Sequence, residues 1–290
     1  MNATNSFSKW LASEANNLTF KFGILSSARV PGGINCSAMG LEETLYLYRW
    51  RSDWTCGTTS YSSNDWRTTK VSLNALKSLI CSAVEAGDRD AVRKACSAVL
   101  KWGGDRSGGK VGAKPFLWQL NDELSAYLTR IREVLSLDNG GFDRIGEVKC
   151  MNAMMTKIHA LLADDGLPIY DSRVAGAAGA LVELYRQNTG QNWSYIPDEL
   201  NFPSTDKKRT ARQLTPNAML PDHLYYNQAG TTTKWAKAKI RLGRVMRDTL
   251  AANPKLFESE LPGDRMHALE ATFFMIGYDP GCLKPSLKHA

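Results

Sequence analysis

Asp171 stands where an extended segment meets the start of a predicted helix, a position at which a carboxylate can do chemistry. Pro168 ends the preceding helical pattern, so Asp171 falls at the N-cap of the helix that starts at Ser172. The free amides and the dipole of a helix start keep such a carboxylate ionised. A fixed, ionised carboxylate could stabilise a cationic sugar transition state. The alternative is a plain helix cap, which the spacing alone favours, because aspartate is common at N-caps.

A lysine precedes this aspartate on a predicted helix that covers residues 150–163. Lys157 lies well inside that helix, beside the apolar face that Met154 and Leu161 form. An amine next to an apolar face can have a lowered pKa and act as a nucleophile. More often, a lysine in this position extends its amine to solvent. We take Lys157 as the second catalytic candidate.

A basic stripe is predicted on a helix near the C-terminus. One helix face carries Lys234, Lys237, Arg241 and Arg244. Between residues 205 and 247 the chain has ten Lys and Arg residues against two acidic residues, an excess comparable to the net charge of the whole chain, +7. Such a patch suits a phosphate backbone, and the alternative is a solvated helix face.

Residue types and spacing argue against a metal or nucleotide cofactor. The six cysteines form no C-x-x-C pair and the four histidines no H-x-x-x-H pattern, which disfavours zinc and iron–sulfur sites. Residues 104–111 resemble a phosphate-binding loop, but Val111 stands where a Ser or Thr would hold magnesium. We expect no cofactor and no metal ligand.

The composition is that of an ordinary globular protein with a basic balance. The 290 residues are 43% hydrophobic, which is ample for a core. A basic balance is typical of proteins that bind nucleic acid, although basic proteins without such a partner are about as common. No apolar run has the length of a membrane span, and residues 1–10 lack the apolar region of a signal peptide. We expect a cytoplasmic protein without a membrane partner.

Helical periodicity dominates the chain after Asp65. Apolar residues recur at helical spacing in at least six segments separated by short links, which indicates a mainly α fold. The first 64 residues are aromatic, and their periodicity fits strands as well as short helices. We divide the chain into a less regular, part-β region at 1–64, a helical core at 65–200 and a basic helical region at 201–290 that completes the same globular unit.

The segment 168–174, placed after a helix that carries Lys157, resembles the catalytic turn of the helix–hairpin–helix DNA glycosylase superfamily. In that superfamily an aspartate ends a proline-containing approach and caps the next helix. Three other stretches are similar to a bacterial branch with the 8-oxoguanine-DNA-glycosylase fold, which includes the Brig-type anti-phage glycosylases: 99–106, 234–247 and 268–278. The resemblance covers about residues 65 to 279.

This resemblance implies helix–hairpin–helix subdomains and a monomeric N-glycosylase that flips out and excises a modified base from double-stranded DNA, with Asp171 as its carboxylate. The implied substrate is glucosylated hydroxymethylcytosine in phage DNA. One alternative is a repair glycosylase for oxidised or alkylated bases. Another is a DNA-binding protein without chemistry, which would have the same basic patch and no need for an ionised carboxylate.

Two departures from the superfamily pattern bear on DNA binding and on lyase activity. The candidate hairpin at 142–149 lacks one expected glycine, and Lys157 lies deeper in its helix than the lysine of members with lyase activity, so we expect a monofunctional enzyme. Besides the stripe, Arg173 and Lys149 are DNA-binding candidates. The candidates for stacking on the extruded base are Tyr170, Trp54, Trp66, Trp102, Trp118 and Trp193.

Overall fold

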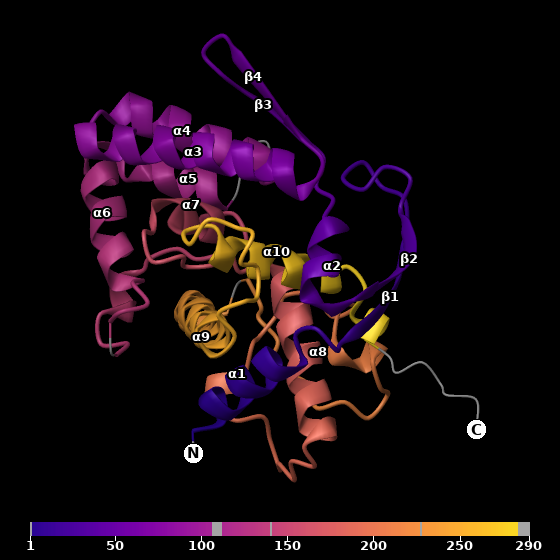
Figure 1. The fold of residues 1–290 in the computed structure, drawn as a ribbon. Coiled ribbons are helices and arrows are strands. Elements are labelled where there is room, and N and C mark those ends of the chain that lie inside the picture. Colours follow the sequence, from indigo (N-terminus) through magenta and orange to yellow (C-terminus); the bar gives the residue numbers. More distant parts are fainter. Residues whose placement is uncertain (1, 106–111, 140, 227, 284–290) are drawn as a thin grey trace.

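The computed structural model describes residues 2–105, 112–139, 141–226 and 228–283 (Figure 1). The protein is mainly helical: ten α-helices lie in the described ranges, and 54% of the described residues are in helices, 3₁₀ helices included. The predicted α-dominated class is therefore confirmed. The β structure expected in the first 64 residues consists of two separate antiparallel hairpins.

The first 64 residues combine these hairpins with two short helices. Alternate residues of the first strand are buried, because one face of the hairpin covers the core. The second hairpin extends above the helical body (Figure 1). In chain order the elements are α1 (Ala3–Glu14), β1 (Thr19–Ile24), β2 (Ile34–Met39), α2 (Gly40–Tyr46), β3 (Ser52–Cys56) and β4 (Thr59–Ser63).

Two long helices, α3 (Trp66–Ala86) and α4 (Arg89–Trp102), pack side by side (Figure 1). Asp65 starts α3 as the sequence predicts, since its side chain accepts a hydrogen bond from the Thr68 amide in a reciprocal capping box. Gly87 ends α3 in a left-handed conformation, at φ 67°, that glycine adopts without strain.

Three shorter helices follow: α5 (Ala113–Gln119), α6 (Leu124–Val134) and α7 (Met155–Leu162). The helix predicted at 150–163 is wrong at its start, because α7 begins only at residue 155. The Asn152 side chain accepts hydrogen bonds from the backbone amides two and three residues later, at 2.9 and 3.0 Å, and this local turn replaces the first helical turn. Lys157 therefore lies in the first turn of its helix.

The core is built around α8 (Ser172–Asn188), which α9 (Thr231–Ala252) and α10 (Arg265–Ile276) accompany. Most of α8 is buried, and it lies in the middle of the molecule (Figure 1). The small residues at its start allow a close backbone approach, as predicted: a Cβ atom on Gly176 would lie 2.7 Å from the carbonyl oxygen of Arg209. A loop segment thus crosses α8 at this glycine.

The N-terminal elements pack against the C-terminal ones. α1 contacts α9, α2 contacts α10, and β1 contacts the last short helix. The 3₁₀ helices of the described chain are Asn121–Glu123, Ile145–Glu147, Asp198–Leu200, Ala211–Gln213 and Pro280–Leu283. No helix in the described ranges combines the length and the apolarity needed to cross a bilayer.

Candidate functional site

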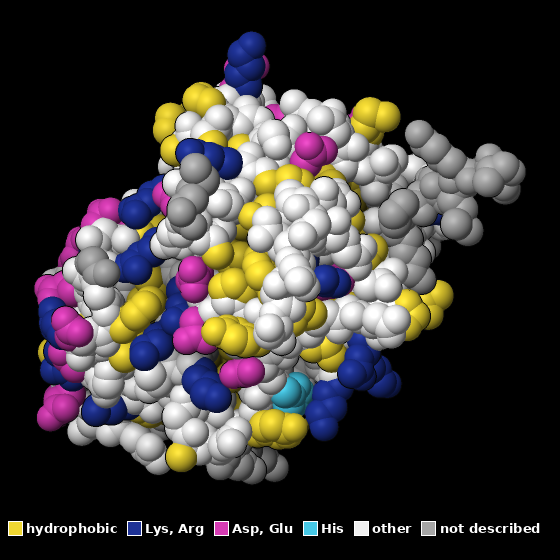
Figure 2. Space-filling model, turned by 90° about the horizontal axis from the view of Figure 1, so that it is seen from below, with side chains coloured by type: hydrophobic (Ala, Val, Ile, Leu, Met, Phe, Trp, Pro, Cys, Tyr) yellow, Lys and Arg dark blue, Asp and Glu magenta, His cyan; other side chains and the backbone are white. Residues whose placement is uncertain are grey.

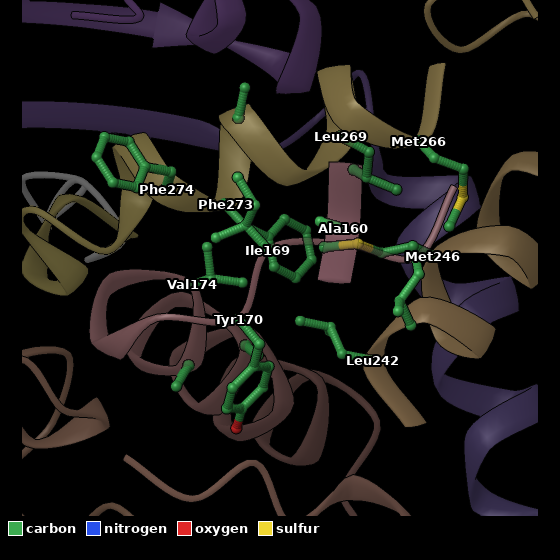
Figure 3. Packing of buried hydrophobic residues seen from close by; sticks show 14 of the residues in the cluster. Ala160, Ile169, Tyr170, Val174, Leu242, Met246, Met266, Leu269, Phe273 and Phe274 are labelled. Carbon is green, nitrogen blue, oxygen red and sulfur yellow. The ribbon is translucent and has the colours of Figure 1, made fainter. Parts of the chain in front are cut away.

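Residues 167–171 cross the core before α8 begins, and apolar packing fixes them in place (Figure 3). Ile169 and Tyr170 are buried among side chains of α8, α9 and α10. The Tyr170 hydroxyl donates to the carbonyl of Pro203, and the Tyr170 carbonyl accepts from the Trp235 indole, both at 2.9 Å. Tyr170 therefore anchors this segment, and the carboxylate that follows stands on a rigid support.

The two oxygens of the Asp171 carboxylate have different surroundings. Oδ1 accepts hydrogen bonds from the amides of Arg173 and Val174, at 2.9 and 3.1 Å, which confirms the predicted N-cap. Oδ2 lies 3.9 Å from the Lys157 amine and 3.7 Å from the Arg173 guanidinium. The residue is 5% exposed. A carboxylate that only capped the helix would not need two cations beside its second oxygen.

Lys157 is buried at the start of α7. Its amine donates to the carbonyl of Ala153 at 3.0 Å, and burial lowers the pKa of the amine while the Asp171 carboxylate raises it. Gly103, at the end of α4, covers the side chain: a Cβ atom there would lie 2.5 Å from the Lys157 Cδ atom. The glycine thus makes the room that the lysine occupies.

The Arg173 guanidinium lies among three aromatic rings. Its central carbon is 5.5 Å from the Trp50 ring centroid, 5.1 Å from that of Phe274 and 4.5 Å from that of Tyr278. These cation–π contacts fix the guanidinium beside Asp171. Sequence analysis missed all three aromatic residues. These residues are far apart in the chain, and only the fold brings them together.

A cavity of about 440 Å³ opens beside Arg173. The end of β1 and the loop after it line one part, and Gln213, Tyr278 and Asp279 line another. Three lining side chains carry a buried polar atom that has no hydrogen-bond partner among the described residues: Arg173 Nε, Gln213 Oε1 and Tyr278 Oη. Buried polar atoms in proteins are nearly always hydrogen-bonded, so these three are exceptions in the wall of the cavity.

Further titratable groups lie behind the site. The fully buried Lys239 amine donates to the carbonyl of Thr156, the neighbour of Lys157, at 2.6 Å, and burial holds the Lys239 pKa well below its usual value. Burial also lowers the pKa of His159 to about 3, and neither of its ring nitrogens has a hydrogen-bond partner among the described residues. Burial in this interior therefore favours the uncharged forms of the Lys239 amine and the His159 imidazole.

The structure does not gather the other predicted aromatic residues at Asp171. Trp54 and Trp66 are buried, and their indoles donate to Ser72 and Glu260. Trp193 packs against Tyr185 at the far end of α8. The other two predicted tryptophans lie at or next to α4.

Trp102 belongs to the end of α4 next to Gly103, and its carbonyl accepts from the Trp50 indole at 3.1 Å. Trp118 is half-buried on α5, with the Arg93 and Lys114 cations over its ring. Both tryptophans therefore flank α4 rather than the carboxylate.

The predicted basic stripe does lie along one side of α9, but most of its members have partners within the protein. Arg241 donates to the carbonyl of Asp198 at 2.6 Å, Arg244 donates to the carbonyl of Asn139, and Lys234 lies 3.6 Å from Asp222. On the face that Figure 2 shows, Lys and Arg side chains are scattered among Asp and Glu side chains.

The Phe142 ring lies beside three of the four side chains of the stripe. Lys237, Arg241 and Arg244 approach its ring within 5.4 to 5.6 Å. Lys149, after the same turn, is exposed and donates to the carbonyl of Gly146 at 3.0 Å. The stripe and the candidate hairpin are therefore neighbours, although among the described residues neither contacts the Asp171 carboxylate.

Two observations bear on the expectation that the protein needs no metal or nucleotide cofactor. Among the described residues, no three His, Cys, Asp or Glu side chains form a group that could hold a metal ion. Residues 106–111 of the loop that resembles a phosphate-binding motif lie outside the described residues. The prediction of no cofactor therefore stays a prediction.

Comparison of the chain with family models, with curated proteins and with solved structures gave no match in any of the three.

Proposed function

We propose that this protein is a DNA N-glycosylase in which Asp171 stabilises the sugar cation that forms as the bond to the base breaks. The observation that carries the proposal is the position of the free Asp171 oxygen, buried between Lys157 and Arg173 on a rigid support. A preorganised charge in a buried site acts more strongly than the same charge in water. The resemblance of residues 168–174 to a glycosylase turn supports the same reading.

The chemistry requires the target nucleotide to leave the base stack. As the glycosidic bond breaks, positive charge develops on the sugar, as it does in glycoside hydrolysis. Asp171 Oδ2 would face that charge, since Oδ1 is held by the helix amides. Arg173 would bind a phosphate of the same nucleotide from its aromatic surroundings. Water then takes up the sugar cation and leaves an abasic site.

The cavity beside Arg173 is the candidate site for the extruded base. Its lining includes a guanidinium from Arg173, a carboxamide from Gln213 and a phenol from Tyr278. Such a set recognises a base through its hydrogen-bonding edge and rejects bases that leave these atoms unpaired. Under the resemblance, glucosylated hydroxymethylcytosine in phage DNA is the proposed substrate, and α6, the 142–149 turn and α7 are the proposed helix–hairpin–helix unit.

The experiment is to incubate the protein with duplexes that contain cytosine, hydroxymethylcytosine or its glucosylated form, and to count strand breaks after alkali. We expect breaks in the modified duplexes and none with Asp171→Asn. Breaks in duplexes with oxidised or alkylated bases would favour the repair alternative. Tight DNA binding without breaks in any duplex would favour the DNA-binding protein without chemistry.

A second activity has its own observation. Lys157 lies in the first turn of α7, 3.9 Å from Asp171, and burial lowers its pKa. A neutral amine there could attack the C1′ aldehyde of an opened abasic sugar, lose water and form an imine. Borohydride reduces an imine to a stable amine, so it should link the protein to abasic DNA covalently. The Lys157→Met variant should give no such product.

A further inference from the structure

α4 carries a groove that leads toward the candidate site. Two hollows, of about 730 and 500 Å³, follow the exposed side of the helix and share Ser97 and Lys101. The turn between β3 and β4 and the ring of Trp118 border the first hollow, and Arg29 and Lys114 border the second. Because the hollows share lining residues, they form one groove.

Cationic side chains outnumber acidic ones along this groove, five to three. Lys94 and Lys101 are exposed, and neither forms an ion pair within the described part of the chain. Of the three acidic side chains, Asp90 lies 3.3 Å from the Arg89 guanidinium, Asp53 accepts from Ser62 at 2.7 Å, and Asp105 lines the second hollow. The groove therefore presents cations that an anionic partner can reach.

The spacing of these cations suits a phosphodiester backbone. Lys94 and Lys101 are seven residues apart, so they lie on one face about 10 Å apart along the helix, with Ser97 between them. A duplex strand carries one phosphate per about 3.4 Å of its axis, so this length of helix faces about three phosphates. Lysine and serine side chains are common phosphate ligands in DNA complexes.

The groove leads to the cavity beside Arg173, because Arg29 lines both the second hollow and that cavity. At the C-terminal end of α4, Gly103 lies directly against Lys157. Farther along the second hollow, Arg29 lies 4.7 Å from the Trp50 ring, whose centroid is 5.5 Å from the Arg173 guanidinium carbon. A strand that followed α4 would therefore arrive beside the cavity next to Arg173.

We infer that the groove along α4 binds the backbone of duplex DNA and delivers a neighbouring nucleotide to the cavity beside Arg173. This inference rests on the proposed function, because the partner is identified partly by where the groove leads. It places the main phosphate contacts on Lys94 and Lys101 rather than on the α9 stripe, whose arginines donate to backbone carbonyls of the protein.

The test compares two double variants that lose the same charge, Lys94→Ala/Lys101→Ala and Lys234→Ala/Lys237→Ala. Fluorescence anisotropy with a labelled duplex, measured across a salt series, gives the slope of log affinity against log salt. Each lost phosphate contact lowers the magnitude of this slope by about 0.9 on duplex DNA. We expect the α4 variant to lose about 1.8 and the α9 variant to keep the wild-type slope. Alanine suits exposed helix positions, so both variants should fold.

The outcomes separate the two proposals. An unchanged slope in the α4 variant, or an equal loss in both variants, would overturn the groove assignment. Base excision by the wild-type protein is measured in parallel. Excision by the wild type together with an unchanged slope in the α4 variant would contradict the groove assignment but not the proposed glycosylase activity. A loss of slope without excision by the wild type would support the groove and remove the glycosylase. A wild-type protein that bound no duplex would overturn both.

Discussion

Two helix starts in this protein have the same cap and different surroundings. Asp88 at the start of α4 accepts amide hydrogen bonds at 2.9 and 3.1 Å, the same distances that Asp171 shows at the start of α8. Asp88 is exposed, however, and has no ion pair among the described residues, whereas Asp171 is buried between two cations. Capping therefore explains one oxygen of Asp171, and the second oxygen needs another explanation.

The largest difference between the two caps should appear in catalysis. Asp171→Asn keeps a capping oxygen but removes the charge, and losing one preorganised group typically slows a reaction about 100- to 1000-fold. We expect that loss in the single-turnover rate of base release, and no change with Asp88→Asn. Similar rates for the two variants would reduce Asp171 to a helix cap.

The interior behind Asp171 should also respond to acid in a way that the α4 start does not. Burial lowers the pKa of His159 to about 3, against 6.5 for an unperturbed histidine. The unfolded chain therefore binds a proton below pH 6.5 while the folded chain does not. The free energy of unfolding falls as the pH falls through this window, by about 2.3 kcal/mol between pH 6.5 and 4.5.

Urea unfolding at several pH values checks this expectation. The His159→Leu variant should show a flatter dependence on pH than the wild type, by about the amount that His159 contributes. Parallel curves for the two proteins would mean that His159 is hydrated in the folded state and titrates normally.

Substitution by alanine should destabilise the protein more at a glycine beside the site than at a glycine in open surroundings. A Cβ atom on Gly103 would lie 2.5 Å from Lys157, whereas one on Gly263 would meet nothing within 4 Å. Overpacking of this kind typically costs about 1–3 kcal/mol, so Gly103→Ala should unfold at lower urea and excise more slowly. Gly263→Ala is the matched control and should leave both measurements near wild type. Equal behaviour would show that Lys157 can move aside freely.

The smallest expected effect is the stability lost when a helix cap is removed. Asp88→Ala and Asp171→Ala each remove a side chain that bonds two amides, and such a loss costs about 1 kcal/mol. Thermal unfolding should therefore show this loss for Asp88→Ala and a larger one for Asp171→Ala, which also leaves the buried Lys157 amine without its carboxylate. Only Asp171→Ala should lose activity. Equal losses of stability would mean that the carboxylate does not stabilise the buried amine.

Local signals predicted those parts of the site that depend on neighbours in the sequence. Pro168 indicated the cap at Asp171, and the onset of helical periodicity at Asp65 indicated the start of α3. The α7 start was placed wrongly because a side chain, Asn152, competes with the helix for backbone amides. A periodicity argument contains no information about that competition.

The remaining parts of the site depend on long-range packing. Trp50, Phe274 and Tyr278 meet around Arg173 although they are far apart in the chain. The chain contains many aromatic residues, and composition alone does not choose among them. The stripe on α9 shows the converse limit: its spacing was predicted, but the backbone carbonyls that its arginines bind come from other segments.

The most direct test of Asp171 measures its preference for a cationic sugar. Duplexes would carry one pyrrolidine, whose protonated ring nitrogen replaces the anomeric carbon, or one neutral tetrahydrofuran in the same place. Transition-state analogues bind at least about 100-fold more tightly than substrates, so we expect the wild type and Asp88→Asn to prefer the cationic pyrrolidine duplex by about that factor. Asp171→Asn should bind both duplexes alike. If Asp171→Asn kept the wild-type preference, the carboxylate would not face the sugar cation, and the proposed mechanism would be wrong.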